Sequence, residues 1–486
     1  MHRQTIRRAW AWAIVLVTAV SGPIQAVRGQ AEADGAGSIA DRYRPAAKRI
    51  IDAALAGNDA YNKLEQLCDG IGNRLSGSPQ LKRAVRWAAA AMTADGQENV
   101  RLESVMVQHW VRGTELLMMN EPREAFMPML GLGGSVATPP EGITADVVSV
   151  ADEKALDALG EAVRGKIVLF NYPMPPFDPE TGSGYGAAVR YRGGGAQMAA
   201  KYGAVACLVR SCTAKSFQSP HTGGMKYGDA ETKIPTAAIT IEDAARITRL
   251  QARGVSVNVT LKMEAKMLAP APSANVIGEL RGTTYPDEIV VIGGHIDSWD
   301  VGQGAHDDGG GCVTAMEAIN VLRRLNMIPQ RTIRVVLWTN EENGLAGGKQ
   351  YAIDHADELS NHVAAIESDG GSFAPIGYSI ACNDEARQAT AVKQMGEILS
   401  LLAPLGATKV ETGHSGADVG PLKGQGVITM SHMVDMSTYF DYHHTHADTL
   451  DKVDPEELSQ NVAVMATVAY ILADMPGRLG EDPAGQ

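Results

Sequence analysis

The chain has 486 residues, of which 45% are apolar, and its 56 acidic side chains outnumber its 43 basic ones, which leaves a formal net charge of −13. This apolar content argues against an intrinsically disordered chain, and the lack of a large basic excess argues against a nucleic-acid partner. At roughly 150 residues for each domain, the length predicts about three domains. The five cysteines are scattered and form no Cys-x-x-Cys pair, so they indicate neither a disulfide framework nor a thiolate zinc site.

Residues 1–31 have the features of a secretory signal peptide. Basic residues that include Arg7-Arg8 precede an apolar run over residues 9–20, and small residues follow it. This run is shorter than the ~20 residues that span a bilayer, so an uncleaved anchor is the weaker alternative. A twin-arginine signal is another, but the residues after the arginine pair match that pattern poorly. We therefore expect an exported protein, secreted or periplasmic, that has no stable membrane insertion after cleavage.

Helical periodicity dominates the first part of the chain that follows. Residues 45–67 carry apolar side chains at the spacing of one helical face, and residues 82–92 show a helical pattern too. No internal repeat accompanies these segments. They predict helices that pack against a core formed later in the chain.

Residues 118–267 have a different character, with frequent glycine and proline and short β-branched runs. The pattern predicts a strand over 165–170, a helix over 196–202 and a strand over 204–209. We expect an inserted β-rich domain with its own small core, which ends at a proline-rich linker over 269–272.

Strand and helix patterns alternate beyond this linker. The expected strands are 288–292, 332–338 and 363–366, and the expected helices between and after them are 312–322, 345–355 and 386–402. A last helix follows Asp454, which can cap it, with Pro455 in its first turn and Glu457 at the acidic position of a capping box. Nearly continuous apolar strands separated by helices predict an α/β fold, with a mostly parallel sheet that helices cover on both faces. We assign this discontinuous domain to residues 40–117 and 268–478.

Acidic and histidine side chains follow the strands of this predicted sheet. Ligands gather at the carboxyl ends of parallel strands, so we expect these side chains to meet at one edge. The residues concerned are His295, Asp297, Asp307, Asp308, Glu341, Glu342, Asp369 and, in a histidine-rich loop, His444.

Clustered carboxylates repel one another and take up protons unless positive charge lies between them. A pair of divalent cations about 3.5 to 4 Å apart, with one carboxylate bridging them, would remove that cost. Imidazole and carboxylate ligands without thiolate favour zinc, and manganese or cobalt would also be tolerated. The cluster therefore predicts a site for two metal ions.

The motifs and their order resemble those of the co-catalytic zinc exopeptidases, a family that includes secreted bacterial aminopeptidases and glutamate carboxypeptidases. They are His-x-Asp, Asp-Asp-Gly-Gly, Glu-Glu, Ser-Asp-Gly and His-Thr-x-x-Asp-Thr, and the similarity runs from about residue 45 to 475. Three further segments, over 219–223, 233–237 and 298–305, resemble one branch of the family in particular. The resemblance implies the zinc exopeptidase fold with a protease-associated domain as the insert. For that branch it also implies hydrolysis of unblocked dipeptides and a homodimer.

The resemblance implies which residues hold the metal ions. His295, Asp307 and Asp369 would bind one ion, while Asp307, Glu342 and His444 would bind the other, so that Asp307 is the bridging ligand.

Two further residues receive catalytic roles. By resemblance, Glu341 is the general base and acid, which takes a proton from the water that the metals activate and later protonates the leaving amine. Asp297 lies two residues from His295 and could accept its second N–H, which would fix the imidazole tautomer. The family also tends to hold the bond between the two aspartates, Asp307-Asp308 here, in the cis form, and its insert shapes the cleft without taking part in the chemistry.

Other residues near these motifs are weaker candidates. His443 and His446 flank the expected ligand, but each ion already has its set. Tyr439 or Tyr442 could stabilise the oxyanion that the reaction requires. The segment 414–418, where relatives place substrate-pocket residues, matches more loosely, so the sequence does not predict the side-chain preference.

Two other functions are compatible with parts of this pattern. One is a broad aminopeptidase that acts on longer peptides, and the other is a catalytically silent, receptor-like binding protein. Lost ligands would mark the silent protein, and none is lost. The chain has no His-Glu-x-x-His helix, Gly-x-Ser-x-Gly elbow, phosphate-binding loop or dinucleotide fingerprint, which argues against single-zinc proteases, serine hydrolases and nucleotide enzymes.

Overall fold

The computed structural model describes residues 38–215 and 217–481. The expected signal peptide at 1–31 lies outside the described residues. Within the described part of the chain, no helix combines the length and apolar character needed to cross a membrane. All five cysteines lie in the described ranges and are unpaired.

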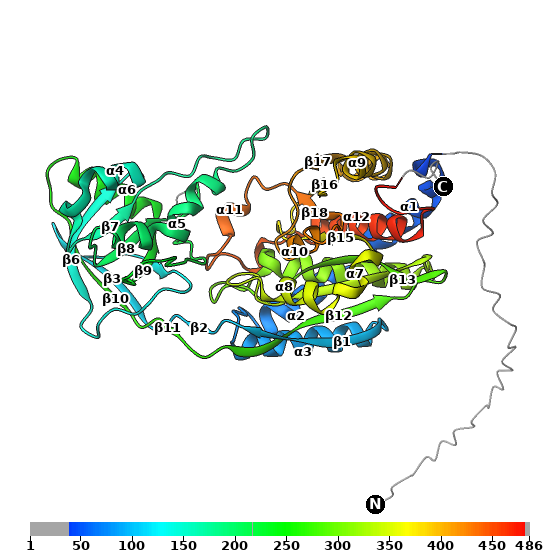
Figure 1. Cartoon of the computed structure of the whole chain (residues 1–486), viewed down its shortest axis with the longest axis horizontal. Helices are drawn as coiled ribbons and strands as arrows, with labels where there is room; N and C mark the ends of the chain where they lie inside the picture. The colour runs from blue at the N-terminus through cyan, green and yellow to red at the C-terminus, as the bar shows by residue number, and fades with distance from the viewer. Residues whose placement is uncertain (1–37, 216, 482–486) are drawn as a thin grey trace, which may run out of the picture. The chain divides into compact units, whose positions relative to one another are not determined.

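The first of two large sheets has eight strands in the order β1-β12-β14-β13-β15-β18-β16-β17 (Figure 1). Its strands are β1 (Glu98–Val107), β12 (Ala271–Leu280), β13 (Tyr285–His295), β14 (Arg331–Trp338), β15 (His362–Glu367), β16 (Pro375–Ala381), β17 (Lys409–Thr412) and β18 (Thr429–Val434). The pairs β14-β13, β13-β15, β15-β18 and β16-β17 are parallel. The pairs β1-β12, β12-β14 and β18-β16 are antiparallel. The sheet is therefore mixed, and the expectation of a mostly parallel sheet holds only for its centre.

Helices cover both faces of this sheet, as predicted. Alternate residues of β13 point to opposite faces, so Val290 and Ile292 join one apolar core while Ile289 and Val291 join another. The first core contains residues of α1 (Ile39–Leu55), α2 (Asp59–Gly70), α3 (Pro79–Ala94), α7 (Gly310–Arg324), α9 (Glu385–Ser400) and α12 (Pro455–Asp474). The second contains residues of α8 (Ala346–Asp354) and α10 (Gly420–Lys423). As expected, the Asp454 carboxylate caps α12 by accepting the N–H groups of Glu456 and Glu457.

The second sheet also has eight strands, in the order β4-β3-β10-β6-β7-β8-β9-β5. Its elements are β3 (Glu115–Glu121), β4 (Ala125–Phe126), β5 (Met129–Gly131), β6 (Ile143–Val150), α4 (Glu153–Leu159), β7 (Ile167–Phe170), α5 (Tyr185–Ala200), β8 (Ala206–Arg210), β9 (Thr236–Ile239), α6 (Ile241–Gln251) and β10 (Asn258–Met263). Strands β6 to β9 are parallel. The chain enters this part through β2 (Trp110–Val111) and leaves it through β11 (Lys266–Met267), which pair antiparallel. The proposed division at residues 118 and 267 stays a prediction.

Three sequence expectations were wrong in detail. The single helix expected over 45–67 is two helices, because the chain breaks at residues 56–58 between α1 and α2. The helix expected over 196–202 begins earlier, at Tyr185. The proline-rich linker at 269–272 is partly strand, since Pro272 pairs with Met106 at the start of β12. Pro272 precedes Val276, where the pairing of β12 with β14 begins, and a proline is compatible with the start of a strand although it is a poor sequence signal for one.

Candidate metal centre

The predicted site residues come together at the carboxyl ends of the three central strands. His295 is the last residue of β13, Glu341 and Glu342 follow β14, and Asp369 follows β15. Asp307 and Asp308 lie just before α7, and His444 follows the short helix α11 (Tyr439–Tyr442). Because β13 pairs with both β14 and β15 in parallel, these strand ends meet at one edge, as the sequence predicts.

Asp307 lies between the two predicted histidine ligands and offers one oxygen to each. Its Oδ1 is 3.2 Å from His295 Nε2, and its Oδ2 is 3.3 Å from His444 Nε2. Its side chain is only 6% exposed. This arrangement is the one that a carboxylate bridging two cations requires.

The other two predicted ligands complete the two halves of the cluster. Asp369 Oδ1 is 3.3 Å from His295 Nε2, and Glu342 Oε2 is 3.1 Å from His444 Nε2. The second oxygen of Glu342, Oε1, accepts the backbone N–H of Trp299 at 3.0 Å. Each histidine therefore faces Asp307 and one further carboxylate.

The chemistry of this donor set fits two cations. His295 Nε2 and Asp307 Oδ2 are buried and have no hydrogen-bond partner among the described residues, although both lie close to oppositely charged groups. Buried polar atoms are rarely left unsatisfied, so one unpaired ligand atom in each half of the cluster indicates that each half can take a further partner such as a metal ion.

The cluster contains two groups of three residues whose ligand atoms lie within 4.8 Å of one another inside each group. Each group includes one residue outside the predicted ligand set. The first group is Asp307, His443 and His444, and the second is His295, Asp308 and Asp369. The His443 ring stacks on His444, with 3.5 Å between ring centroids, and its Nε2 is 3.8 Å from Asp307 Oδ2.

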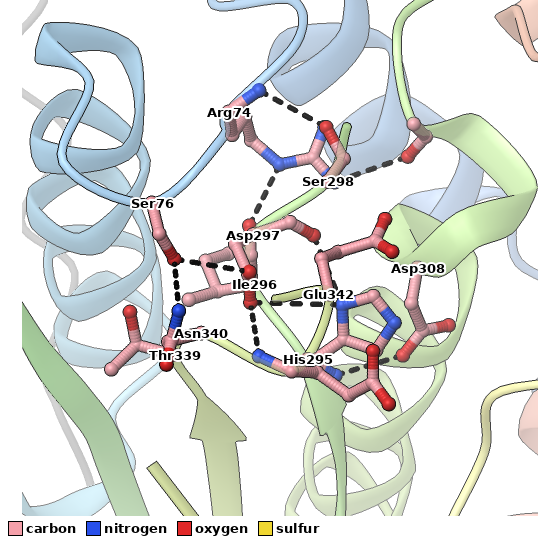
Figure 2. Close-up of polar contacts among 12 residues, drawn as sticks. Arg74, Ser76, His295, Ile296, Asp297, Ser298, Asp308, Thr339, Asn340 and Glu342 are labelled. Atoms are coloured by element: carbon pink, nitrogen blue, oxygen red, sulfur yellow. Dashed lines mark hydrogen bonds and ion pairs between the residues drawn. The ribbon is translucent and has the colours of Figure 1, made fainter. Parts of the chain in front are cut away.

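Both carboxylate oxygens of Asp308 accept hydrogen bonds from backbone N–H groups. Its Oδ2 accepts the N–H of His295 at 2.9 Å (Figure 2), and its Oδ1 accepts the N–H of Gly311 at 3.0 Å. A Cβ on Gly294 would lie 2.2 Å from the same carboxylate, so only glycine allows this close approach. Asp308 thus fixes the end of β13 against α7, and the Asp307-Asp308 bond is cis as expected.

Asp448, part of the last motif, fixes the backbone before α7 from the other side. Its Oδ1 accepts the N–H groups of Ala305 and His306 at 3.1 and 2.7 Å, and its Oδ2 accepts that of Asp307 at 3.2 Å. The sequence motif contained this residue, but its spacing gave no indication that it orients the bridging aspartate.

Asp297 holds the turn that carries Glu341, but it does not contact His295 in the expected way. The His295 Nδ1 partner is the Asp297 carbonyl oxygen, at 3.0 Å, whereas the nearest carboxylate oxygen is 3.8 Å away. The Asp297 carboxylate instead accepts the Glu341 backbone N–H at 3.0 Å and the Ser76 hydroxyl at 3.3 Å. Figure 2 shows Ser76 in turn accepting a hydrogen bond from Asn340. The main chain therefore fixes the imidazole, and the carboxylate positions Glu341.

Arg74 was not indicated by any sequence pattern. Its side chain is fully buried and donates to the Ile296 carbonyl oxygen at 2.8 Å (Figure 2). It also donates to the carbonyl oxygens of Gln303 and Gly304, at 2.6 and 3.1 Å. A buried guanidinium satisfied in this way holds the loop after β13 in place.

Burial and like charge shift the ionisation of the cluster. Burial, with repulsion from Asp307, raises the pKa of Glu342 to about 7. Burial alone would lower the pKa of His444, but Glu342 and Asp307 outweigh it and raise that pKa to about 9. The pKa of His295 is raised in the same way by Asp369 and Asp307. Burial and repulsion from Asp369 and Glu342 raise the pKa of Glu341.

Metal binding at pH 7.5 is therefore expected to release protons. His444, whose pKa is raised to about 9, carries a proton at pH 7.5 in the metal-free protein, and the neighbouring carboxylates raise the pKa of His295 in the same direction. A cation binds only the neutral imidazole. We expect release of about one to two protons for each protein that fills both sites, and less as the pH rises past 9. Titration calorimetry in buffers of different ionisation enthalpy measures this number. A release near zero at pH 7.5 would contradict the imidazole ligation.

Activity should fall below pH ~6, because protons compete with the metal ions for the two imidazoles.

The remaining sequence candidates separate by position. Tyr439 is buried, and its ring centroid is 5.1 Å from that of His443. Burial, with the charges of Asp307 and Asp369, raises the pKa of its phenol. Tyr442 instead stacks on His306, at 5.8 Å between ring centroids. His446 is exposed and belongs to neither group of ligand atoms. In the segment 414–418, the Asp418 N–H binds the buried Glu367.

Comparison with known proteins places this site in a family. The model of peptidase family M28 matches residues 275–469, which span all the predicted metal ligands. Carboxypeptidase Q of Mus musculus is 43% identical over 436 residues, 89% of this chain and 90% of the relative, and the Homo sapiens protein is 42% identical over 432 residues.

A solved structure supports the same assignment over both sheets. The crystal structure of a peptidase M28 precursor from Shewanella amazonensis SB2B covers 90% of this chain and 98% of its own, with 37% identity and a TM-score of 0.85. With the relatives above, which match nearly their whole length, this likeness identifies a metallopeptidase: the chain belongs to peptidase family M28.

Proposed function

We propose that the protein is an exported exopeptidase that uses two zinc ions to hydrolyse unblocked dipeptides. The observation that carries this proposal is the position of Asp307, with one oxygen toward each histidine of a buried carboxylate cluster. His295, Asp307 and Asp369 would hold one ion, and Asp307, Glu342 and His444 the other. Similarity to carboxypeptidase Q over 89% of the chain supports a carboxypeptidase Q-like activity.

The residues around the ions divide the remaining work. When bound, the two ions would polarise the scissile carbonyl and lower the pKa of the attacking water. Glu341 accepts a proton from that water and delivers one to the leaving amine. Asp297 holds Glu341 in place by accepting its backbone N–H, and Tyr439, buried beside His443, would donate a hydrogen bond to the developing oxyanion.

A substrate panel tests the dipeptidase assignment. Protein stripped of metal and reloaded with zinc, manganese or cobalt is assayed on free dipeptides, the same dipeptides with a C-terminal amide, and longer peptides. An enzyme that recognises the free carboxylate of a dipeptide should hydrolyse the amides and longer peptides at least about tenfold more slowly, which corresponds to about 1.4 kcal/mol of transition-state binding. Equal rates on all three would instead support a broad aminopeptidase.

Export and assembly are parts of the same proposal. Residues 1–31 have the composition of a signal peptide, and fractionation of cells that express the full chain should place the mature protein outside the cytoplasm. We also propose a homodimer, which light scattering of the mature protein would test.

A further inference from the structure

His444 is held by the main chain of Thr222, which lies far away in sequence between β8 and β9. The Thr222 N–H donates to the His444 carbonyl at 3.0 Å, and the Thr222 carbonyl oxygen is 3.2 Å from His444 Nδ1. If Nε2 is to bind a metal ion, Nδ1 must carry the proton and donate it to this carbonyl. Arg192 Nη1 lies 3.4 Å from the same oxygen and 3.3 Å from Nδ1. A guanidinium cannot accept a hydrogen bond, so the carbonyl is the group to which a protonated Nδ1 donates. The second sheet therefore supplies the partner that fixes the tautomer of His444.

The backbone of His444 also depends on this contact. Its φ is +61°, a left-handed conformation that is unfavourable for a residue other than glycine. Such a conformation persists only where the surroundings fix it, and here Thr222 bonds both the main chain and the ring.

Glu342, the other ligand in this half of the cluster, is oriented by the loop after β13. The Trp299 N–H occupies Glu342 Oε1, which leaves Oε2 directed at His444. The Trp299 ring fits against Gly133, two residues after β5, where a Cβ would lie 2.1 Å from it, and its centroid is 5.6 Å from that of the His444 ring. Asp300 is the next residue of this loop.

Arg112 binds both the residue that holds His444, Thr222, and the loop that holds Glu342, at Asp300. Its guanidinium binds Asp300 through two hydrogen bonds, Nε to Oδ2 at 2.9 Å and Nη2 to Oδ1 at 2.5 Å. The same Nη2 donates to Thr222 Oγ1 at 3.2 Å, and Nη1 donates to the Gly131 carbonyl at 2.5 Å, which Thr222 Oγ1 also contacts at 2.8 Å. The Arg112 side chain is 10% exposed. One planar, fork-shaped cation therefore ties the segment behind His444 to the segment behind Glu342.

The other half of the cluster has no such link. Within residues 38–215 and 217–481, the hydrogen bonds of Arg112 reach Asp300, Thr222, Gly131 and Glu115 but neither His295 nor Asp369. His295 is fixed instead by the Asp297 carbonyl and by Asp308. A change at Arg112 should thus be felt on one side of Asp307 only.

We propose that Arg112 is a positioning residue for one of the two metal sites, the one formed by Glu342 and His444 with Asp307. This rests on the two-metal site of the proposed function. Arg112 touches no reacting atom. It sets the orientation of both ligands that are not shared with the first ion, through the Asp300–Trp299 loop and through Thr222.

Metal titration of Arg112→Gln tests this proposal. Zinc binding is measured by competition with a chromophoric chelator, which resolves the two affinities without any assay of turnover. We expect zinc to bind about 10- to 100-fold more weakly at one site, the usual effect of losing an outer-shell partner, with the other site unchanged. Arg112→Lys, which keeps the charge but not the fork, should restore only part of the affinity.

Two backgrounds identify the affected site. In Asp369→Asn, which weakens the His295 site, Arg112→Gln should weaken the one tight site that remains. In Glu342→Gln, which weakens the His444 site, it should have little further effect, because both changes act on the same ion. Arg334→Gln is the matched control, since this buried arginine binds Glu279 of β12 and Glu358 of the short helix Ala356–Asn361, and contacts no residue of the cluster in the described structure. It should leave both affinities unchanged.

The outcomes separate the inference from the proposed function. Equal loss at both sites, or two unchanged affinities in Arg112→Gln, would overturn the positioning role while leaving the two-metal site intact. Failure of the unmodified protein to bind two zinc ions would instead overturn the proposed function. If Arg112→Gln does not fold, Asp300→Asn breaks the same link with a smaller change and should weaken the same single site.

Discussion

Replacing Glu341 with glutamine is expected to lower kcat by about 10²- to 10⁴-fold while both metal ions stay bound. Glutamine has nearly the same shape but cannot accept a proton from water. The backbone N–H that donates to Asp297 is unchanged by the substitution, so the turn after β14 should keep its position. The loss should therefore appear in turnover and not in metal content.

Kinetics and metal analysis of the same preparation check this prediction. Glu342→Gln is the matched control, because it changes the adjacent residue in the same way but removes a charged ligand 3.1 Å from His444 Nε2. It should lose zinc as well as activity. If Glu341→Gln retains full activity, or loses its metal as readily as Glu342→Gln does, Glu341 is not the general base.

Replacing Asp307 with asparagine should weaken both metal sites at once. Asp307 directs one oxygen toward each histidine, so a neutral amide removes the negative charge from both ions and replaces one oxygen by a nitrogen that cannot coordinate. Loss of an outer-shell partner already costs about 10- to 100-fold in metal affinity, so loss of a shared ligand should cost at least about 100-fold at each site. We expect protein dialysed against zinc at low micromolar concentration to retain well under two equivalents and no measurable activity.

Single-sided variants make the test specific. Asp369→Asn and Glu342→Gln each remove a carboxylate that faces only one histidine, and each should leave the opposite site occupied. Circular dichroism of the metal-free proteins shows whether all three variants remain folded. Asp307 is not the bridge if its replacement empties only one site.

The ligand set could be predicted because it follows from strand order. His295, Glu342 and Asp369 each come within a few residues of the end of an apolar strand, and parallel strands bring those ends to one edge. The residues that orient the ligands could not be predicted in this way. Thr222 acts through its main-chain groups, which no residue type reveals, and Arg112 is one arginine among many in the sequence.

The strands of the first sheet likewise divide into those that the sequence predicts and those that it does not. Central strands such as β15 are buried on both faces, and residues 363–366 of that strand form a continuous apolar run, so the sequence predicts it well. Strand β1 is at an edge, with several half-exposed and charged residues, and its partner β12 begins within the segment Ala271-Pro272. Their antiparallel pairing depends on contacts over more than 160 positions of sequence, which local periodicity does not encode.

The two hydrogen bonds between Thr222 and His444 limit how far this enzyme could be shortened without loss of function. Excising the residues between β2 and β11 to obtain a minimal catalyst would remove the carbonyl that sets the imidazole tautomer, even though every metal ligand would remain in the shortened chain. A chimera that carries an insert from another protein would work only if the new insert presents a peptide group at that same point. The two sheets are in this respect a single functional unit.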